Sequence, residues 1–179
     1  FIREKMNTVV RGRKDLESMT IPFVGEIPLA FRKKGNRFSR QPKEEKCAVV
    51  VKDKSRNVIN EAFRVVRTNL EFVVGKERAS NVIMLTSANP GSGKTFITFN
   101  LATSLAIKGK RVIAIDLDLR KGSLSEYAGR PKAGISDYLV GQVNRIDEVV
   151  IRSDNANLDI IPVGTIPPNP TELLFAERL

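Results

Sequence analysis

Apolar residues recur at helical spacing between residues 57 and 74. On a wheel of about 100° per residue they fall within about 120° of one another, as the buried face of a helix would. The members of this stripe are Ile59, Ala62, Phe63, Val66, Leu70, Val73 and Val74. The pattern predicts an amphipathic helix over residues 57–74 that buries one face against the rest of the chain.

Three short apolar runs have the character of buried strands. Residues 81–87, 111–118 and 158–164 are rich in apolar and β-branched side chains. Between the first two runs lies a helical stretch at 96–109, which Gly109 ends. Strand, loop, helix and strand then form one βαβ unit with a right-handed crossover. We therefore expect an α/β fold, with a parallel sheet of three strands and helices on both of its faces.

The remaining segments predict shorter helices. Residues 135–140 have a helical apolar pattern, and residues 144–151 have a second one. Asn169 and Pro170 suit the N-cap and first turn of a last helix over residues 171–179. These helices continue the α/β pattern, so residues 57–179 are expected to form part of one domain, which is incomplete at its C-terminus.

The first 56 residues are expected to form a basic arm or linker. Residues 1–18 have a helical pattern, residues 20–30 are apolar but interrupted by two prolines, and residues 31–46 are polar. The arm holds 15 Lys and Arg against 7 Asp and Glu, and so carries +8 of the net charge of +10. Such an arm either binds nucleic acid or anionic lipid, or is a solvated linker. Its four phenylalanines show no pattern of a nucleic-acid-binding motif.

Composition excludes several kinds of chemistry. The chain has one cysteine, Cys47, and no histidine, so it can form neither an internal disulfide nor a zinc site, and it lacks a histidine for acid–base catalysis. No run approaches the roughly 18 apolar residues that a membrane span requires. Because the sequence begins at Phe1, we expect it to be a fragment of a longer cytoplasmic protein.

The sequence ANPGSGKT at residues 88–95 predicts a phosphate-binding loop. Gly91 and Gly93 let the backbone N–H groups close around phosphates, Lys94 reaches the β- and γ-phosphates, and the Thr95 hydroxyl takes a Mg²⁺ position. Ala88 replaces the usual first glycine. The expected domain is therefore of P-loop NTPase type, with ATP and Mg²⁺ as cofactors. The predicted nucleotide-binding residues are Asn89, Pro90, Gly91, Ser92, Gly93, Lys94, Thr95, Phe96 and Arg120.

Two acids follow the second predicted strand. Asp116 and Asp118 are two residues apart, so on an extended strand both side chains lie on the same side, at the carboxyl end where ligands bind in α/β folds. We expect both to hold Mg²⁺ or its waters together with Thr95, and one of them to orient an attacking hydroxyl. A pair of solvated acids at a strand end is the alternative. Arg120 either contacts phosphate or pairs with Asp118.

The motifs together resemble the cytoplasmic domain of the bacterial tyrosine kinases of capsule and exopolysaccharide synthesis. The resemblance covers most of residues 57–179 and rests on TSANPGSGKT, IDLDLR, EAFRVVR, GISDYLVG and IIPVGTIPPNPTELL. It implies a Walker A loop at 88–95 and a second acidic motif, Walker A′, at 115–120. It also implies that the segment after the family's second transmembrane helix corresponds to the arm, which favours lipid over nucleic acid as its partner.

The family's ExxRxxR helix, used for subunit contact, matches Glu61, Arg64 and Arg67. The resemblance therefore implies a homo-oligomer that forms through this helix. The alternative is that the three side chains pair with one another on a solvated helix face.

Two features refine the resemblance. The related ParA and MinD ATPases have a signature lysine at the second loop position, where this chain has Asn89, and this difference favours the kinase. The family's Walker B aspartate and its C-terminal tyrosine cluster lie beyond residue 179, so we expect this fragment to be inactive alone. We assign neither Tyr127 nor Tyr138 as a phosphorylation site.

The resemblance implies an ATP-dependent tyrosine autokinase at the cytoplasmic face of the bacterial inner membrane. Lys94, Asp116 and Asp118 would be its catalytic residues, and polysaccharide copolymerase or export components would be its partners. The alternatives are an ATP-binding assembly module of the export machinery without phosphotransfer, and an ATPase of the ParA and MinD kind.

Overall fold

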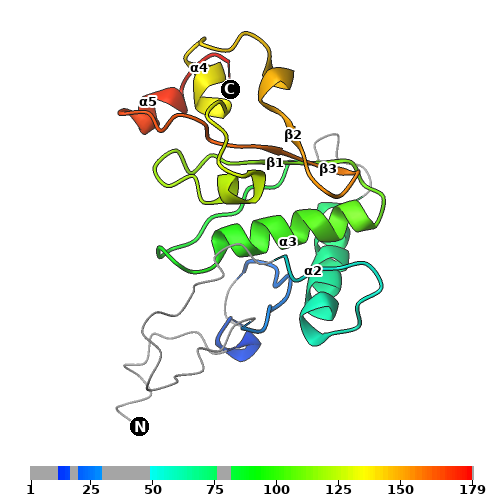
Figure 1. Cartoon of the computed structure of the whole chain (residues 1–179). Coiled ribbons are helices and arrows are strands. Elements are labelled where there is room, and N and C mark those ends of the chain that lie inside the picture. Colours follow the sequence, from blue (N-terminus) through cyan, green and yellow to red (C-terminus); the bar gives the residue numbers. More distant parts are fainter. Residues whose placement is uncertain (1–11, 17–19, 30–48, 76–81, 179) are drawn as a thin grey trace, which may run out of the picture.

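The computed structural model describes residues 12–16, 20–29, 49–75 and 82–178. Figure 1 shows an α/β arrangement in which α3 (Lys94–Ile107) lies between α2 (Val58–Val74) and a small sheet. The short helices α4 (Ile135–Leu139) and α5 (Pro170–Leu173) lie beyond the other side of the sheet. The order of layers is thus helix, helix, sheet, helices. The predicted α/β class with flanking helices is confirmed.

The helix predicted at 57–74 is present as α2. Its N-cap is Asn57, whose side-chain oxygen accepts a hydrogen bond from the Asn60 N–H at 2.7 Å, and Gly75 ends it with a φ of 72°. Phe63 is the fully buried residue of its apolar stripe, whereas Val73 is 47% exposed. The buried face packs on α3, where Phe63 and Phe96 have ring centroids 5.9 Å apart.

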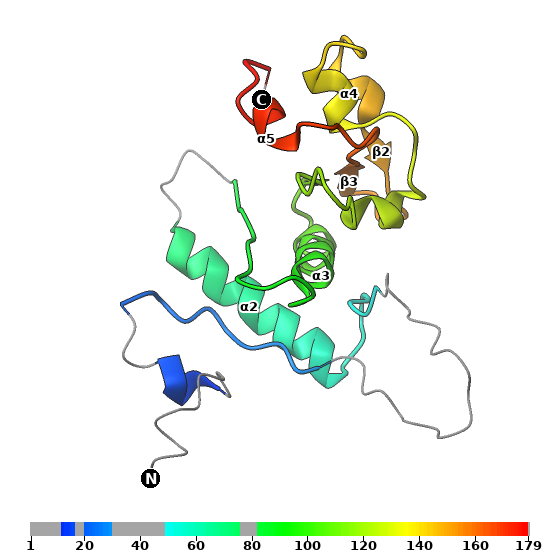
Figure 2. The same cartoon turned by 90° about the vertical axis from the view of Figure 1, so that its left-hand side faces the viewer.

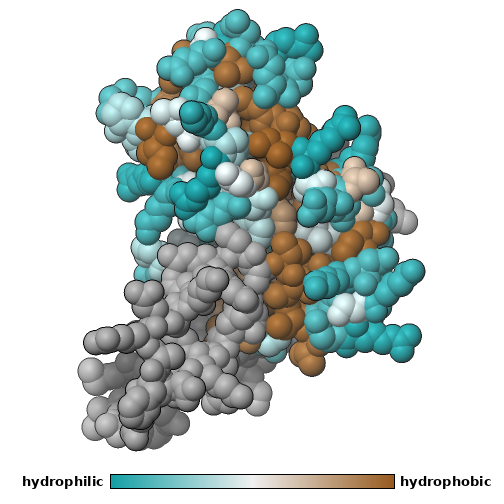
Figure 3. Space-filling model, in the orientation of Figure 1, coloured by the Kyte–Doolittle hydropathy of each residue, from teal (hydrophilic) through white to brown (hydrophobic). Residues whose placement is uncertain are grey.

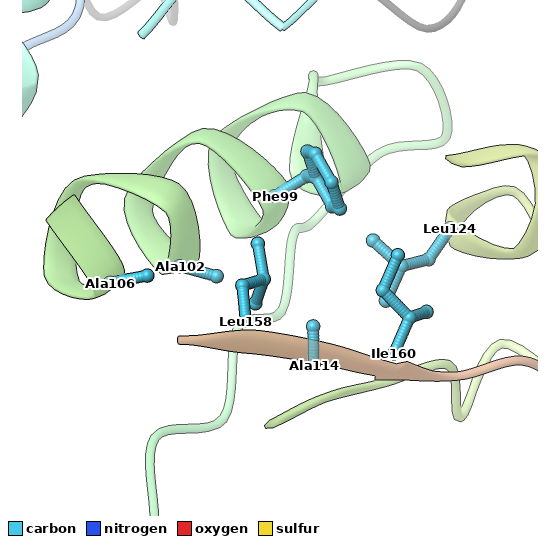
Figure 4. Close-up of a cluster of buried hydrophobic side chains, with 7 residues drawn as sticks. All are labelled: Phe99, Ala102, Ala106, Ala114, Leu124, Leu158 and Ile160. Carbon is cyan, nitrogen blue, oxygen red and sulfur yellow. The ribbon is translucent and has the colours of Figure 1, made fainter. Parts of the chain in front are cut away.

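α3 packs closely on the sheet because it presents alanines to it. Ala102 and Ala106 let the helix approach the strands, and Phe99 fills the space further toward the N-terminus of the helix. Figure 4 shows this core between α3 and the sheet. Its members are Phe99, Ala102, Ala106, Ala114, Leu124, Leu158 and Ile160. The helix predicted at 96–109 is confirmed and begins two residues earlier, directly after the glycine loop.

The sheet has the order β1-β3-β2 and is mixed rather than entirely parallel. β1 (Val112–Ile115) runs parallel to β3 (Leu158–Ile161), with Val112 opposite Leu158. β2 (Ile151–Arg152) pairs antiparallel with β3, because a turn that begins at Ser153 connects the two directly. The helix predicted at 144–151 is wrong in part. The structure has a 3-10 turn there, η3 (Ile146–Val149), and β2 follows it.

The predicted first strand at 81–87 is not formed. Residues 82–86 have no regular secondary structure, and Val82 and Met84 are 87% and 85% exposed; residue 81 lies outside the described residues. A strand requires a neighbour that satisfies its backbone groups, and no strand in the described part of the chain pairs with this segment. The expected three parallel strands and the first βαβ unit are thus corrected to a parallel pair with one antiparallel edge.

Figure 3 shows a band of hydrophobic surface down the middle of the face seen in Figure 1. Several apolar side chains of the described residues are exposed in the unpaired segment, in β1 and just after β1. They include Val82, Ile83, Met84, Ile113, Ile115 and Leu117. The apolar run at 81–87 predicts a buried strand, but Val82, Ile83 and Met84 are exposed in the structure.

Parts of the arm pack on the domain. Residues 20–29 run along α2 (Figure 2), where the Asn69 side chain donates to the Val24 carbonyl at 2.8 Å. The Val50 and Val51 N–H groups donate to the side-chain oxygen of Asn100 in α3, at 2.9 and 3.1 Å. Of the helix predicted at 1–18, the described residues show a 3-10 turn, η1 (Arg13–Leu16). The linker at 31–46 lies outside the described residues, and the domain division at residue 57 stays a prediction.

The other short helices follow the sequence in part. The helix predicted at 135–140 is confirmed as α4, and η2 (Leu124–Ala128) is a 3-10 helix that was not predicted. The last helix spans Pro170–Leu173 rather than 171–179, and the side chain of Asn169 makes no capping hydrogen bond to it. No helix among the described residues is long and apolar enough to cross a bilayer.

Candidate functional site

The glycine loop leads directly into α3. Gly91 and Gly93 have φ angles of 78° and 87°, a region in which residues with a Cβ are strained. A Cβ at either position would meet no atom of the chain within 4 Å. The glycines are therefore required by the backbone conformation and not by internal packing, and the space beside them is open to a ligand.

Two hydroxyl groups hold the loop in shape. The Ser92 hydroxyl donates to the Asn89 carbonyl at 2.7 Å, and the Ser87 hydroxyl donates to the same carbonyl at 3.1 Å. In α3, the Ile97 N–H donates to the carbonyl of Gly93 in the loop. The N–H groups before Ile97 lie in the first turn, where they have no acceptor within the helix and where the helix dipole is positive. Such a terminus favours an anion.

The two predicted acids have different surroundings. Asp116 is 3% exposed, and its N–H donates to the Ile161 carbonyl, so it continues the pairing of β1 with β3. Its Oδ2 accepts hydrogen bonds from the N–H and the hydroxyl of Ser125, at 2.8 and 2.7 Å. Its Oδ1 accepts from the Asp118 N–H at 3.2 Å. Asp116 is thus a buried carboxylate with hydrogen-bond donors on both of its oxygens.

Asp118 is the acid that meets the loop lysine. Its Oδ2 lies 3.7 Å from the Nζ of Lys94, and both side chains are partly exposed. The Lys121 N–H donates to Asp118 Oδ1 at 3.3 Å. The structure therefore brings together Lys94 of the first motif and Asp118 of the second.

Three other predicted nucleotide-binding residues have different surroundings. Thr95 is half-buried in the first turn of α3, whereas Phe96 packs its ring on Phe63 of α2. Arg120 is exposed and lines a depression of about 270 Å³ together with residues 168–172. Of the two alternatives for Arg120, pairing with Asp118 is not among the ion pairs of the described residues, and phosphate contact stays a prediction.

The predicted subunit-contact residues of α2 separate into two groups. Arg64 pairs with Glu61 at 2.7 Å on an exposed helix face, and the hydrogen bond and charge of Glu61 raise the pKa of the Arg64 guanidinium. Arg67 instead donates to the Ser104 carbonyl of α3 at 2.8 Å. Glu61 and Arg64 are accessible to another molecule, whereas Arg67 joins two helices of the same chain.

The geometry fits a magnesium nucleotide. An open glycine loop, the N-terminus of a 14-residue helix and Lys94 are suited to a polyphosphate. Among the described residues, no three acidic, cysteine or histidine side chains lie together as a group that could hold a metal ion. Mg²⁺ in nucleotide sites binds through one or two carboxylates, waters and the phosphates themselves. Thr95, Asp116 and Asp118 are the residues that would hold it.

Comparison with known proteins gives a consistent result. A family model described as an AAA domain matches residues 80–166. The chain is 35% identical to the tyrosine-protein kinase wzc of Salmonella typhimurium, over 99% of this chain and 25% of that protein. It is 32% identical to the tyrosine-protein kinase etk of Escherichia coli K12, over 99% of this chain and 26% of that protein. The chain thus spans about a quarter of the length of these curated relatives.

A solved structure extends the comparison to the fold. The kinase domain of the Escherichia coli tyrosine kinase ETK aligns with a TM-score of 0.77 and 32% identity, over 92% of this chain and 64% of that chain. The fold and site define a P-loop-type α/β domain. The resemblance to the cytoplasmic domain of bacterial tyrosine kinases is confirmed.

Sequence reasoning missed one residue at the site. Ser125 makes two hydrogen bonds to Asp116, yet it lies outside both motifs. A serine nine residues after an aspartate carries no periodic or spacing signal, since the intervening chain must turn back for the two to meet.

Proposed function

We propose that this chain is part of an ATP-dependent protein tyrosine kinase, which phosphorylates itself and regulates the synthesis and export of capsular or exopolysaccharide. The observation that carries the proposal is the meeting of Lys94 with Asp118 beside an open glycine loop. The names of the matched relatives, which are tyrosine-protein kinases, support the phosphoryl-transfer activity.

The residues divide the work of phosphoryl transfer, which requires mainly positioning and charge neutralisation. Lys94 and the N–H groups of the loop bind and orient the phosphates. Thr95, Asp116 and Asp118 would hold Mg²⁺ directly or through water, and the ion would supply charge neutralisation at the phosphate oxygens. Lys94 would bind the phosphates, and Asp118 would orient the incoming tyrosine hydroxyl.

The tyrosine that receives the phosphoryl group comes from outside the described residues. Tyr127 stacks on Phe99 with ring centroids 3.9 Å apart, and its hydroxyl oxygen is buried. Tyr138 lies beneath the Arg178 guanidinium, 5.6 Å from the ring centroid. Both tyrosines are held by packing, so the acceptor is a tyrosine elsewhere in the whole protein or in a neighbouring subunit. We expect residues 1–179 alone to be inactive.

Replacement of Lys94 by methionine in the full-length protein tests the kinase. The change removes the charge that holds the γ-phosphate while it keeps a long apolar stem, so autophosphorylation is expected to fall at least about 100-fold. The measurement is phosphotyrosine content after incubation with MgATP. Lys110→Met is the matched control, because Lys110 is an exposed lysine in the turn after α3.

Phosphotyrosine that persists in Lys94→Met would contradict the proposal. If the unmodified full-length protein binds MgATP tightly but forms no phosphotyrosine, the second candidate function gains: a nucleotide-dependent assembly module of the export machinery. The packed positions of Tyr127 and Tyr138 are compatible with either function, because the acceptor tyrosine of the proposed kinase lies outside the described residues.

The partners of the whole protein are part of the same proposal. The basic arm would lie against anionic lipid at the cytoplasmic face of the inner membrane, with no role in nucleic-acid binding. Glu61 and Arg64 would contact a neighbouring subunit, and export components would bind the assembled oligomer. Binding of the arm to duplex DNA, but not to anionic vesicles, would contradict the lipid assignment.

A further inference from the structure

Ser125 is buried in η2, and its hydroxyl has a fixed orientation. The residue is 3% exposed. The Val163 N–H donates to the Ser125 hydroxyl oxygen at 2.8 Å. Because a serine hydroxyl carries a single proton, and that proton is directed to Asp116 Oδ2 at 2.7 Å, the group is a donor to Asp116 and an acceptor from Val163. The backbone N–H of Ser125 donates to the same carboxylate oxygen.

The contacts of Ser125 extend to the site through Asp116. The other oxygen of that carboxylate accepts the Asp118 N–H at 3.2 Å, and this hydrogen bond fixes the turn that follows β1. The Asp118 carboxylate then lies 3.7 Å from Lys94. A continuous series of contacts therefore joins Val163, at the end of β3, to the lysine of the glycine loop.

The donors to Asp116 indicate why the residue is a carboxylate. All three are neutral N–H or O–H groups, and together they stabilise a buried negative charge that an amide side chain would not carry. Asp116 is thereby held beside Asp118, whose carboxylate pairs with Lys94.

We propose that Ser125 is a positioning residue for the acidic pair: it orients the Asp116 carboxylate and, through it, Asp118 for the magnesium of the bound nucleotide. This inference rests on the part of the proposed function that concerns binding of a magnesium nucleotide, and not on the part that concerns phosphoryl transfer. Partners that orient the groups around a metal are typically worth roughly 10–100-fold in metal affinity.

The test is calorimetric titration of the full-length protein with ADP, in excess Mg²⁺ and in EDTA. Ser125→Ala is expected to weaken MgADP binding roughly 10-fold or more, and metal-free ADP binding less than about 2-fold, because the loop and Lys94 are unchanged. Ser123→Ala is the matched control. Ser123 precedes the same 3-10 helix, and among the described residues its side chain makes no capping hydrogen bond.

Two outcomes would overturn the proposal. In one, Ser125→Ala keeps the full gain in ADP affinity that Mg²⁺ gives; in the other, it weakens ADP binding equally with and without Mg²⁺. If Ser125→Ala does not fold, Ser125→Cys decides, since it keeps a side chain of similar size but replaces the hydroxyl by a weak donor. Ser125→Cys is likewise expected to lose Mg²⁺-dependent ADP affinity. If Mg²⁺ raises the ADP affinity of this variant as much as that of the unmodified protein, the proposal is again overturned.

The experiment separates this inference from the kinase itself. A protein that forms no phosphotyrosine, but loses Mg²⁺-dependent ADP affinity in Ser125→Ala, supports the role of Ser125 and contradicts the kinase. A protein that forms phosphotyrosine and keeps that affinity in Ser125→Ala supports the kinase and contradicts the role of Ser125.

Discussion

At the scale of single residues, backbone conformation and hydrogen bonding decide what the motif residues do. Gly93 is at the N-cap of α3 in the left-handed region, and open space surrounds the position where a Cβ would lie. Asp116 and Asp118 are equivalent in the sequence pattern, yet the first is buried among neutral donors and the second meets Lys94. The motif therefore contains one acid with hydrogen bonds to the neighbouring chain and one acid that pairs with the lysine of the glycine loop.

Replacement of Gly93 by alanine is expected to lower the free energy of unfolding by about 1–2 kcal/mol, because an alanine at positive φ is strained. Nucleotide affinity should fall as well, since the loop would relax out of its conformation. Denaturant unfolding and ADP titration measure the two effects. The control is Gly12→Ala, at a glycine without positive φ and with no atom within 4 Å of its Cβ position. Equal stability of both variants would refute the conformational argument.

At the scale of elements, polar side chains join segments that are distant in sequence. Asn100 of α3 is fully buried; its oxygen accepts the Val50 and Val51 N–H groups, and its amide donates to the Phe96 carbonyl. The segment before α2 is thus attached to the helix that carries the glycine loop. A periodicity argument assigns Asn100 to a polar face and does not predict this attachment.

Replacement of Asn100 by alanine leaves two buried N–H groups unpaired and is expected to cost about 2–4 kcal/mol of stability. Amide hydrogen exchange at Val50 and Val51 should accelerate more than exchange in the middle of α3. Asn144→Ala serves as the control, because Asn144 is exposed. Unchanged protection of the Val50 and Val51 amides would mean that Asn100 does not hold the segment.

At the scale of the whole molecule, α2 is both a structural element and a candidate contact surface. Its inner side is attached to α3 by Arg67 on Ser104 and by Glu71 on Lys108. Its outer side exposes the Glu61–Arg64 pair and Phe72, which is 88% exposed. One helix therefore connects any contact between subunits to the helix that begins at the nucleotide loop.

The two arginines of this helix are expected to respond differently to replacement. Arg67→Ala removes buried hydrogen bonds and should lower the stability of each subunit by about 1–3 kcal/mol. Arg64→Ala should change stability by less than about 0.5 kcal/mol, because its ion pair is exposed, but should weaken self-association of the full-length protein. Denaturant unfolding and analytical ultracentrifugation separate the effects. Normal self-association of Arg64→Ala would remove it from the proposed interface.

Sequence patterns alone predict the α/β class, the helices at 57–74 and 96–109 and the two later strands, and they locate the glycine-loop and acidic motifs. These depend on local periodicity and on residue types that chemistry requires at fixed spacing. Tertiary structure decided that 82–86 forms no strand, that β2 is antiparallel, and that Ser125 lies on Asp116. Strand pairing and buried hydrogen bonds depend on which distant segments meet, and a one-dimensional pattern does not contain that information.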